Sequence, residues 1–421
     1  MFQKTTFKNG LRVITVPMKN TKAVTVLVLV GTGSKYEKKE INGISHFLEH
    51  MFFKGTKKRP STLKIAETLD KVGGAFNAST SEEFTGYFAK VDSKYLDLAL
   101  DWVSDIFLNS KIKPQEIEKE KGVIVEELNM YLDTPIKYIG DLWEELLYGD
   151  QPAGWKTIGR RENILKFQRK NFLDYLKNHY SVLNTIVCLA GNFNQKEILA
   201  KIKKYFKKIS KKPPLGKIAI KESQEKPGLL LHFKKTDQTH LCLGVRGYDL
   251  FSPQRYAQQL IATILGGNMS SRLFIKVRGK KGLAYYIQTD SELYTDSGYL
   301  VTQTGVPHQD VVKVINLIIQ EYKNIRDKKI SKEELQKAKD YLKGSLSLSL
   351  ESSDAQASFY AFQELLTGKI LTAEEKLKMI DKIKREDIQN VAKEIFQPQK
   401  LNLALIGPHK NDKIFKEILT I

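Results

Sequence analysis

The chain has 421 residues, of which 41% are hydrophobic, and this length exceeds what a single hydrophobic core usually supports. We therefore expect two domains of about 200 residues each. Only two cysteines occur, which excludes a disulfide framework, and the net charge of +20 raises the question of an anionic partner.

The lysines that cause this charge alternate with glutamates in segments such as KEELQKAKDYLKG (332–344). This pattern is typical of a solvated helix surface. It favours such a surface over a preference for acidic peptides, and over nucleic-acid binding, which groups basic with aromatic residues. Cys188 and Cys242 lie in apolar runs, where we expect core residues in a reducing compartment. Without a signal segment or an apolar run of membrane-spanning length, we expect a cytoplasmic protein with no membrane partner.

The first distinctive segment is GISHFLEHMFFKGT, at positions 43–56. Its apolar residues suit a helix of about a dozen residues that has Asn42 as its N-cap and stops before Gly55. The question is why such a helix would carry three ionisable residues between phenylalanines.

His46 and His50 are four positions apart, so they lie on one face of this helix, with Glu49 beside them. The alternative is a core helix with hydrogen-bonded polar residues, but burying all three together is costly without a ligand. Two neutral imidazoles and a carboxylate suit zinc, which lowers the pKa of a bound water toward ~7. The segment therefore predicts part of a zinc site.

The next segment, GGAFNASTSEEFTGYFAKV (73–91), begins with two glycines and continues with alternating apolar and polar residues. The pattern predicts a turn followed by a strand. Taken alone, Asn77 would be a surface residue of a core strand.

A third protein ligand is needed for a tetrahedral site, and the helix predicted between Pro114 and Pro135 can supply it. Glu120 and Glu127 are two turns apart and point the same way, whereas Glu126 lies about 100° round the helix. Geometry alone leaves Glu126 and Glu127 open as ligands, and an exposed glutamate is the alternative for each. The neighbouring apolar residues Val123 and Ile124 favour burial of these glutamates over exposure.

Two halves of the chain repeat the same order of elements. Gly31 corresponds to Gly247 and Gly191 to Gly407, both 216 positions apart. Between these landmarks each half has a helix, a strand pair and further helices, and only the first half carries the histidines. We expect an α+β fold of two homologous α/β-layer domains, each a mostly antiparallel sheet with helices packed on one face.

The predicted boundaries follow from a proline-containing, highly charged segment between the halves. We expect a zinc-bearing catalytic domain at 1–210, a linker at 211–228, and a homologous domain without metal at 229–421.

HFLEH (46–50), followed by EKEKGVIVEE (118–127), resembles the inverted zinc motif of the insulinase and pitrilysin metallopeptidases. The likeness covers nearly the whole chain, including the segments at 73–91 and 265–286, and is greatest to mitochondrial processing peptidases and their bacterial relatives. A short GGNMSS turn replaces the long glycine-rich loop of the presequence-binding subunit, which argues against a dedicated targeting-peptide role.

The resemblance implies His46, His50 and Glu127 as ligands of one zinc ion per chain. It implies Glu49 as the base that takes a proton from zinc-bound water and passes it to the leaving amine. It also implies Glu120 as a supporting acid beside the ligands.

The resemblance further implies that a peptide substrate adds as a strand next to Asn77, Ala78 and Ser79. Arg278 and Tyr285 match a pair that faces the zinc site, with Tyr285 at the oxyanion and Arg278 on the substrate backbone. Taken alone, Arg278 would be a surface residue and Tyr285 a core aromatic.

Longer members of this family are about twice the length of this chain, and each encloses a chamber by itself. We therefore expect two copies of this chain to face each other. The expected protein is a zinc endopeptidase, homodimeric, that cleaves unfolded peptides in a closed chamber; a heterodimer with a paralogue is also open. The alternatives are a non-catalytic assembly subunit of the same family and a basic nucleic-acid-binding protein.

Overall fold

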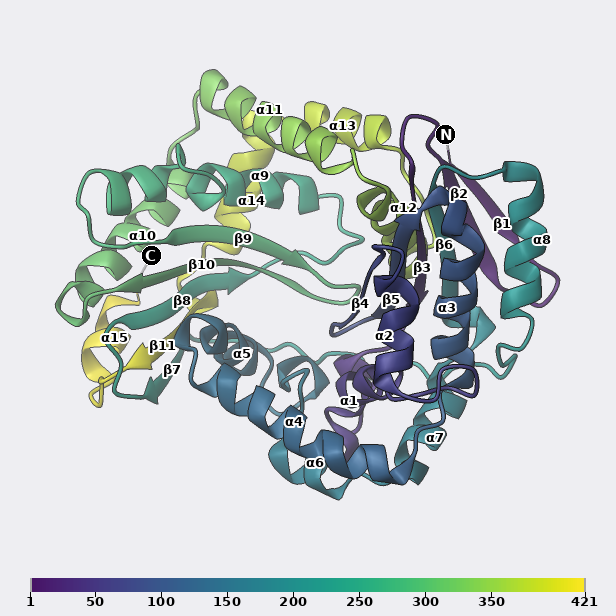
Figure 1. The fold of residues 1–421 in the computed structure, drawn as a ribbon. Coiled ribbons are helices and arrows are strands. Elements are labelled where there is room, and N and C mark those ends of the chain that lie inside the picture. The colour runs from purple at the N-terminus through teal and green to yellow at the C-terminus, as the bar shows by residue number, and fades with distance from the viewer. Residues whose placement is uncertain (1, 420–421) are drawn as a thin grey trace. The chain divides into compact units, whose positions relative to one another are not determined.

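The computed structural model describes residues 2–419, which form two compact units (Figure 1). Unit 1 contains the residues up to Asn129 together with Trp155–Ile218 and Leu348–Leu371. Unit 2 contains Met130–Gly154, Ala219–Ser347 and the residues from Thr372 onward. Each unit has one β-sheet packed with helices, which confirms the predicted α+β fold.

The sheet of unit 1 has six strands in the order β1-β2-β6-β3-β5-β4, so β1 and β4 are its edges. Neighbouring strands are antiparallel except β2 and β6, which are parallel. The strands are β1 (Gln3–Thr6), β2 (Arg12–Pro17), β3 (Ala23–Val30), β4 (Ala75–Thr80), β5 (Thr85–Asp92) and β6 (Thr185–Gly191).

The sheet of unit 2 has five strands in the order β7-β11-β8-β10-β9, again with a single parallel pair, β7 and β11. Its strands are β7 (Gly228–Phe233), β8 (Thr239–Arg246), β9 (Ile287–Leu293), β10 (Gly298–Val306) and β11 (Leu401–Gly407). Both sheets are thus mostly antiparallel, as the repeat predicts.

The helices are divided between the units by the contacts that they make. Those of unit 1 are α1 (Ile44–Met51), α2 (Thr62–Asp70), α3 (Leu96–Asn109), α4 (Pro114–Leu132), α6 (Arg161–Lys166), α7 (Arg169–His179), α8 (Gln195–Phe206) and α12 (Ser353–Thr367). Those of unit 2 are α5 (Pro135–Tyr148), α9 (Arg255–Gly266), α10 (Val311–Asp327), α11 (Lys332–Ser349), α13 (Ala373–Lys382), α14 (Arg385–Ile395) and α15 (Lys413–Ile418). The last residues of α4 are counted with unit 2 and the last of α11 with unit 1.

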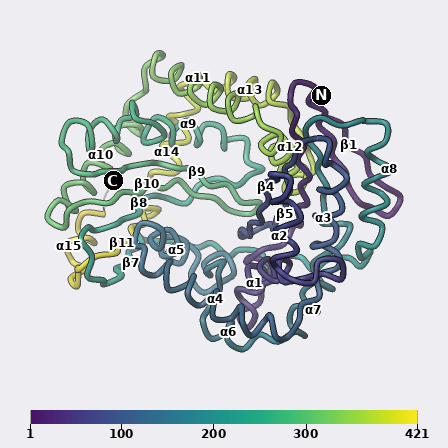
Figure 2. The backbone as a smooth tube through the Cα atoms, in the orientation of Figure 1, coloured from purple at the N-terminus to yellow at the C-terminus, as the bar shows by residue number. Residues whose placement is uncertain are grey.

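The sheet of unit 1 carries helices on both faces, rather than on the one face that was predicted, because its central strands are apolar on both sides, as in AVTVLVLV of β3. On one face, Leu27 and Leu29 pack with Ala357 and Tyr360 of α12, a helix from the C-terminal half of the chain. Figures 1 and 2 show this yellow-green helix beside the purple and blue strands. Glu364, near the end of α12, is buried and pairs with Lys4 of the first sheet.

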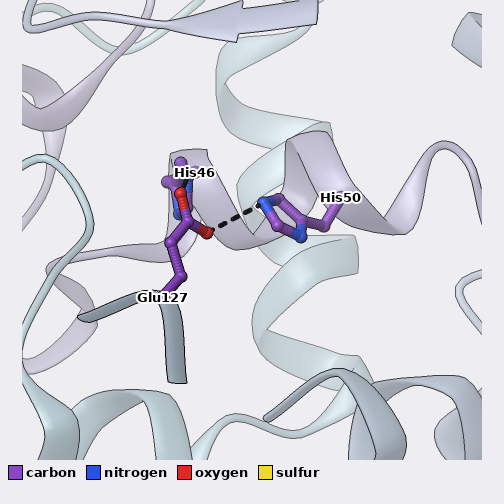
Figure 3. A group of neighbouring side chains, drawn as sticks. All are labelled: His46, His50 and Glu127. Atoms are coloured by element: carbon purple, nitrogen blue, oxygen red, sulfur yellow. Dashed lines mark ion pairs between the residues drawn. The ribbon is translucent and has the colours of Figure 1, made fainter. Parts of the chain in front are cut away.

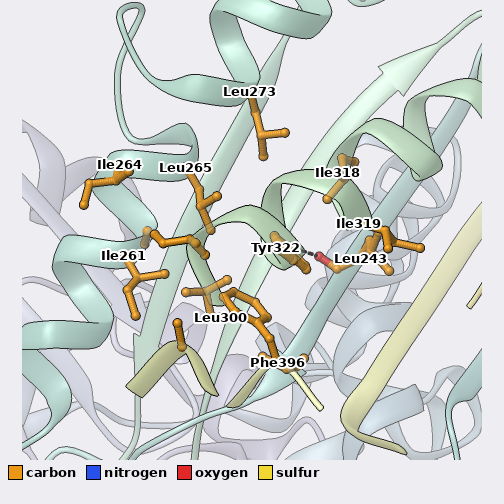
Figure 4. Packing of buried hydrophobic residues seen from close by; sticks show 14 of the residues in the cluster. Leu243, Ile261, Ile264, Leu265, Leu273, Leu300, Ile318, Ile319, Tyr322 and Phe396 are labelled. Carbon is orange, nitrogen blue, oxygen red and sulfur yellow. Dashed lines mark hydrogen bonds between the residues drawn. The ribbon is translucent and has the colours of Figure 1, made fainter. Parts of the chain in front are cut away.

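The sheet of unit 2 has a matching arrangement. One face packs on α9, α10 and α14 in a core that includes Leu243, Leu300 and Tyr322, whose hydroxyl donates to the Leu243 carbonyl at 2.9 Å (Figure 4). On the other face, Cys242 and Ala404 pack against α5, which comes from the N-terminal half of the chain. Cys188 and Cys242 are both free and buried, as expected for core residues.

The compact units differ from the predicted division at 210 and 228 in two segments, which contain α5 and α12. Each of these helices packs on the sheet of the other half of the chain. The sequence-based boundaries remain a prediction about the duplicated halves, because compactness groups residues by contact rather than by repeat.

Candidate metal centre

Helix α1 holds the histidines because one of its faces is entirely buried. Ile44, Phe47, Leu48 and Met51 are inaccessible to solvent, while the side with the ionisable residues is half-exposed. The apolar residues between the ionisable ones therefore fix the rotation of the helix about its axis.

The start of α1 differs from the prediction. The residue that precedes the helix is Gly43, with φ of +99°, and not Asn42. Gly43 is required because a Cβ there would lie 2.7 Å from the backbone of Gly159. The helix also ends at Met51, so it has eight residues rather than about a dozen, and Gly55 lies beyond its end.

Glu37 caps this helix, which the sequence did not indicate. Its buried carboxylate accepts hydrogen bonds from the backbone N–H groups of Gly43 (2.7 Å) and Ser45 (2.8 Å), and from the Asn42 amide (3.0 Å). A carboxylate here satisfies free N–H groups at the positive end of the helix dipole. Burial nevertheless outweighs these bonds and raises the pKa of Glu37 to about 7.

Three donor groups meet next to α1, and they are the predicted ligands His46, His50 and Glu127 (Figure 3). One atom of each lies within 4.8 Å of the others. The two carboxylate oxygens of Glu127 are 3.7 Å from Nε2 of His46 and 3.5 Å from Nε2 of His50. These separations are too long for hydrogen bonds.

The donor set fits zinc. Donors placed ~2.0–2.1 Å from a tetrahedral ion lie roughly 3.3 Å from one another, which is close to the separations observed. Burial and the neighbouring His50 lower the pKa of His46 to about 3, so this imidazole is neutral and its lone pair is free for a metal. Nδ1 of His46 is buried and has no hydrogen-bond partner among residues 2–419.

Helix α4 places the two adjacent glutamates differently. Glu127 faces the histidines and is half-buried, while Glu126 is exposed and accepts a hydrogen bond from Asn129. The apolar neighbours were expected to favour burial of the glutamates, but only Ile124 is itself buried; Val123 is 51% exposed, because it lies on the outer side of α4.

Glu120 contacts His50, one of the residues that the resemblance implied it would support. One of its carboxylate oxygens is 2.9 Å from Nδ1 of His50, and the other is 2.6 Å from the Lys54 ammonium. Burial tends to raise the pKa of Glu120, but the bonds to His50 and Lys54 outweigh it and hold the pKa below its usual value. The ionised carboxylate fixes the orientation of the His50 ring.

Glu49 lies on the same helix but is not one of the three converging donors. Its Oε2 atom accepts a hydrogen bond from the Thr80 hydroxyl at 2.5 Å. Burial raises the pKa of Glu49, with Thr80 and His50 opposing this effect and Glu127 adding to it. A carboxylate with a raised pKa beside a metal-type donor set can exchange a proton with a substrate or a water.

The segment at 73–91 forms two strands rather than the single strand predicted. The hairpin of β4 and β5 reverses at residues 81–84, and β4 is an edge of the sheet. Asn77 and Ser79 are exposed and Ala78 is half-buried. The Asn77 side chain accepts from the N–H of Ala78 at 2.9 Å.

Arg278 and Tyr285 belong to unit 2 and lie at and just after a short π-helical segment, Phe274–Gly279. The Arg278 guanidinium lies over the Tyr285 ring, 5.1 Å from its centroid, and 4.9 Å from the centroid of Phe274. Tyr285 is 78% exposed, so it is not the core aromatic that its sequence context alone suggested.

Three residues of the site were missed in the sequence: Glu37, Lys54 and Thr80. Each acts through a contact with α1 or α4 rather than through a recognisable spacing. Lys54 alone had a local signal, because it lies four positions after His50 and therefore on the same side of a continuing helix.

A pair of imidazoles and a carboxylate with a neighbouring glutamate, on one of two similar α+β units, is the arrangement of a two-domain metallopeptidase. Comparison with family models agrees. Residues 12–159 match the model described as "Insulinase (Peptidase family M16)", and residues 166–342 match "Peptidase M16 inactive domain". The chain therefore belongs to the insulinase family, peptidase family M16.

Relatives of similar length carry matching names. A Bacillus subtilis (strain 168) protein named "Uncharacterized zinc protease YmxG" is 36% identical over 98% of this chain and 99% of its own. A solved structure described as a protease from Helicobacter pylori has a TM-score of 0.89 and 25% identity, covering 97% of this chain and 99% of its own.

A chain in the structure titled "Complex III2 from Candida albicans, Inz-5 bound" has a TM-score of 0.85 and 19% identity, with complete coverage of both chains. This likeness concerns the fold alone. Among the described residues, no helix is long and apolar enough to cross a bilayer.

Proposed function

We propose that the chain is a zinc-dependent endopeptidase that cleaves unfolded peptides or small polypeptides, with one zinc ion per chain. The observation that supports it is the approach of His46, His50 and Glu127 to zinc-binding separations beside Glu49. A bound zinc ion supplies Lewis acidity, which polarises a peptide carbonyl and acidifies water.

Glu49 is the proposed general base. It accepts a proton from the attacking water and returns it to the leaving amine, and the same helix turn places it next to His50. Glu120 holds His50 through its Nδ1 atom and leaves Nε2 directed at Glu127.

The edge strand β4 is the proposed substrate platform. A peptide that adds to β4 gains main-chain hydrogen bonds near Asn77, Ala78 and Ser79, and such bonds depend little on substrate sequence. Asn77 and Ser79 are exposed, which leaves this edge accessible to the peptide.

The active form is proposed to be a cytoplasmic homodimer whose two copies enclose a chamber, with Tyr285 and Arg278 of one copy completing the site of the other. Tyr285 would donate to the oxyanion and Arg278 would hold the substrate backbone. The exposure of Tyr285 and its contact with Arg278 support this role. A heterodimer with a paralogue would need the same two residues.

Mixing two inactive variants tests this dimer. Glu49→Gln protein and Tyr285→Phe protein, combined under conditions that allow subunits to exchange, are expected to recover part of the activity. Absence of any recovery, with exchange verified by native mass spectrometry, would contradict completion of the site between copies.

Cleavage of unstructured peptides by wild type and by Glu49→Gln, read by mass spectrometry with metal content measured alongside, tests the reaction itself. We expect metal-dependent internal cleavage by wild type, and retained zinc with a loss of about 100-fold or more in rate for the variant. An equally active variant would overturn the mechanism. Zinc binding without cleavage by wild type would indicate an assembly subunit, and salt-sensitive DNA retention without cleavage would indicate a nucleic-acid binder.

A further inference from the structure

The carboxylate of Glu49, the proposed base, makes only one hydrogen bond to the rest of the described chain. Its partner is Thr80, whose hydroxyl donates to Glu49 Oε2 at 2.5 Å across the gap between α1 and the edge strand β4. The other oxygen, Oε1, accepts no hydrogen bond from residues 2–419. The two carboxylate oxygens are therefore not equivalent.

Thr80 points toward α1 because of its position in β4. Phe76, Ala78 and Thr80 are half-buried, and the residues that alternate with them are exposed. The same face brings the Phe76 ring to 6.4 Å from that of Phe53, just after α1. The alternation of the strand thus directs the hydroxyl at the helix that carries Glu49.

The backbone after Thr80 is held firmly. Ser81 N–H donates to the Phe84 carbonyl at 2.9 Å and closes the turn, while the Ser81 carbonyl accepts from Ser34 N–H at 3.3 Å. Gly33 approaches so closely that a Cβ there would lie 2.0 Å from the Ser81 carbonyl oxygen. Thr80 is consequently a fixed donor rather than one on a mobile loop.

A hydroxyl that donates to a carboxylate makes a charge-assisted hydrogen bond, which favours one orientation of the group. A general base accepts its proton on one of its two oxygens. Occupation of Oε2 leaves Oε1 as the oxygen that is free to do so.

We propose that Thr80 is a positioning residue for Glu49: its hydroxyl holds Oε2 and so assigns proton transfer to Oε1. The inference rests on the proposed endopeptidase function and adds a residue to it. It also places two tasks on one strand, because β4 would align both the peptide and the base. Thr80 itself touches neither substrate nor metal.

The test compares Thr80→Val, which removes the hydroxyl at nearly constant volume, with Thr80→Ser, which retains it. Thr5→Val is the matched control, since Thr5 is a half-buried threonine on the opposite edge strand of the same sheet, where its side chain makes no hydrogen bond within residues 2–419. For each protein we would measure kcat, KM, zinc content and thermal unfolding, using a quenched unstructured peptide.

We expect kcat of Thr80→Val to fall about 10- to 100-fold, the loss expected for a hydrogen bond to a charged group. KM and zinc content should stay within about twofold, because substrate and metal contacts are untouched. Thr80→Ser should recover most of kcat, and Thr5→Val should match wild type.

An unchanged kcat in Thr80→Val would overturn the inference, as would a Thr80→Ser protein no better than Thr80→Val. A fall in zinc content or a rise in KM equal to the loss of rate would show a structural role instead. If Thr80→Val does not fold, Thr80→Ala is compared with Thr80→Ser by the same criteria. Inactive wild type would mean failure of the proposed function, which this comparison therefore separates from failure of the Thr80 role.

Discussion

Helix α1 in unit 1 and helix α9 in unit 2 each follow a central strand of their sheet, yet they differ in how their polar side chains are hydrogen-bonded. On α9, Gln258 is completely buried: it accepts from Tyr248 N–H at 2.9 Å and donates to the Ser291 hydroxyl at 2.8 Å. On α1, the Nε2 atoms of His46 and His50 face the carboxylate oxygens of Glu127, at distances longer than a hydrogen bond.

This difference indicates that, of the two corresponding helices, α1 rather than α9 can bind a ligand. Gln258 of α9 uses its amide to join the helix to its sheet, whereas the Nε2 atoms of His46 and His50 on α1 remain available for a ligand. The mutations below separate groups that serve the fold from groups that serve the site, in order of decreasing expected effect.

The largest expected difference is in zinc affinity, between variants of the two adjacent glutamates on α4. Glu127→Gln should weaken zinc binding by more than about 100-fold, because it removes one of three donors, and should abolish cleavage. Glu126→Gln is the control, since Glu126 is exposed and one position away. Competition with a chromogenic chelator measures zinc affinity. Equal affinities of the two variants would remove Glu127 from the site.

The start of α1 depends on the buried carboxyl group of Glu37, whereas α9 has no capping side chain at Gln254. Because the pKa of Glu37 is raised to about 7 from 4.5, its contribution to stability is complete below pH 4.5 and is lost as pH rises through 7. Wild type should therefore lose about 3 kcal/mol more than Glu37→Gln between pH 5 and pH 8. Urea unfolding of both proteins at each pH measures this; a difference that does not change with pH contradicts it.

A change at Gln258 should affect stability and not zinc binding, the opposite of the change at Glu127. Gln258→Leu leaves Tyr248 N–H and the Ser291 hydroxyl without their partner, which should lower the free energy of unfolding by about 2 kcal/mol. Zinc affinity should be unchanged, because α9 carries no metal donor. Denaturant unfolding measures the first quantity and chelator competition the second. A loss of zinc would break the distinction between the two helices.

Lys54 should have the smallest effect, since it acts on the metal through two intermediates, Glu120 and His50. Lys54→Met keeps the length of the side chain but releases the Glu120 carboxylate, and we expect zinc affinity to fall about tenfold. Lys57→Met, at an exposed nearby lysine, is the control. Chelator competition that finds both variants equal to wild type would show that Glu120 holds His50 unaided.

The part of the site that the sequence predicted is the part determined by helix geometry. The i,i+4 spacing of His46 and His50 forces both rings to one side of any helix, and the two-turn spacing of Glu120 and Glu127 does the same on α4. The family resemblance chose Glu127 over Glu126, and only the packing of α4 shows Glu126 exposed.

The remainder depends on contacts between segments that spacing does not relate. Thr80 is 31 positions from Glu49, and Glu120 is 70 positions from His50. Asn42 looked like a cap because its residue type is common at that position, but Glu37 reaches the helix N–H groups from an earlier turn of chain. The apolar Val123 and Ile124 favoured burial of both glutamates, but neighbours in a helix face different ways, and Glu126 is exposed while Glu127 is half-buried.

The fold class was predictable from the repeat and from strand patterning, but the exchange of α5 and α12 was not. An apolar helix face shows that the helix will be covered, but it does not indicate which sheet will cover it. The apolar faces of both sheets, including Leu27 and Cys242, accept a helix from either half on composition alone.

That exchange has a consequence for how the protein can be divided. Cutting the chain in the 211–228 segment would leave an N-terminal fragment without α12 and a C-terminal fragment without α5, each with an uncovered apolar sheet face. Neither fragment should then accumulate alone, and production of both together should restore each through the helix that the other donates. Because each half of the chain contains a helix that covers the sheet of the other half, we expect the two halves to fold only together.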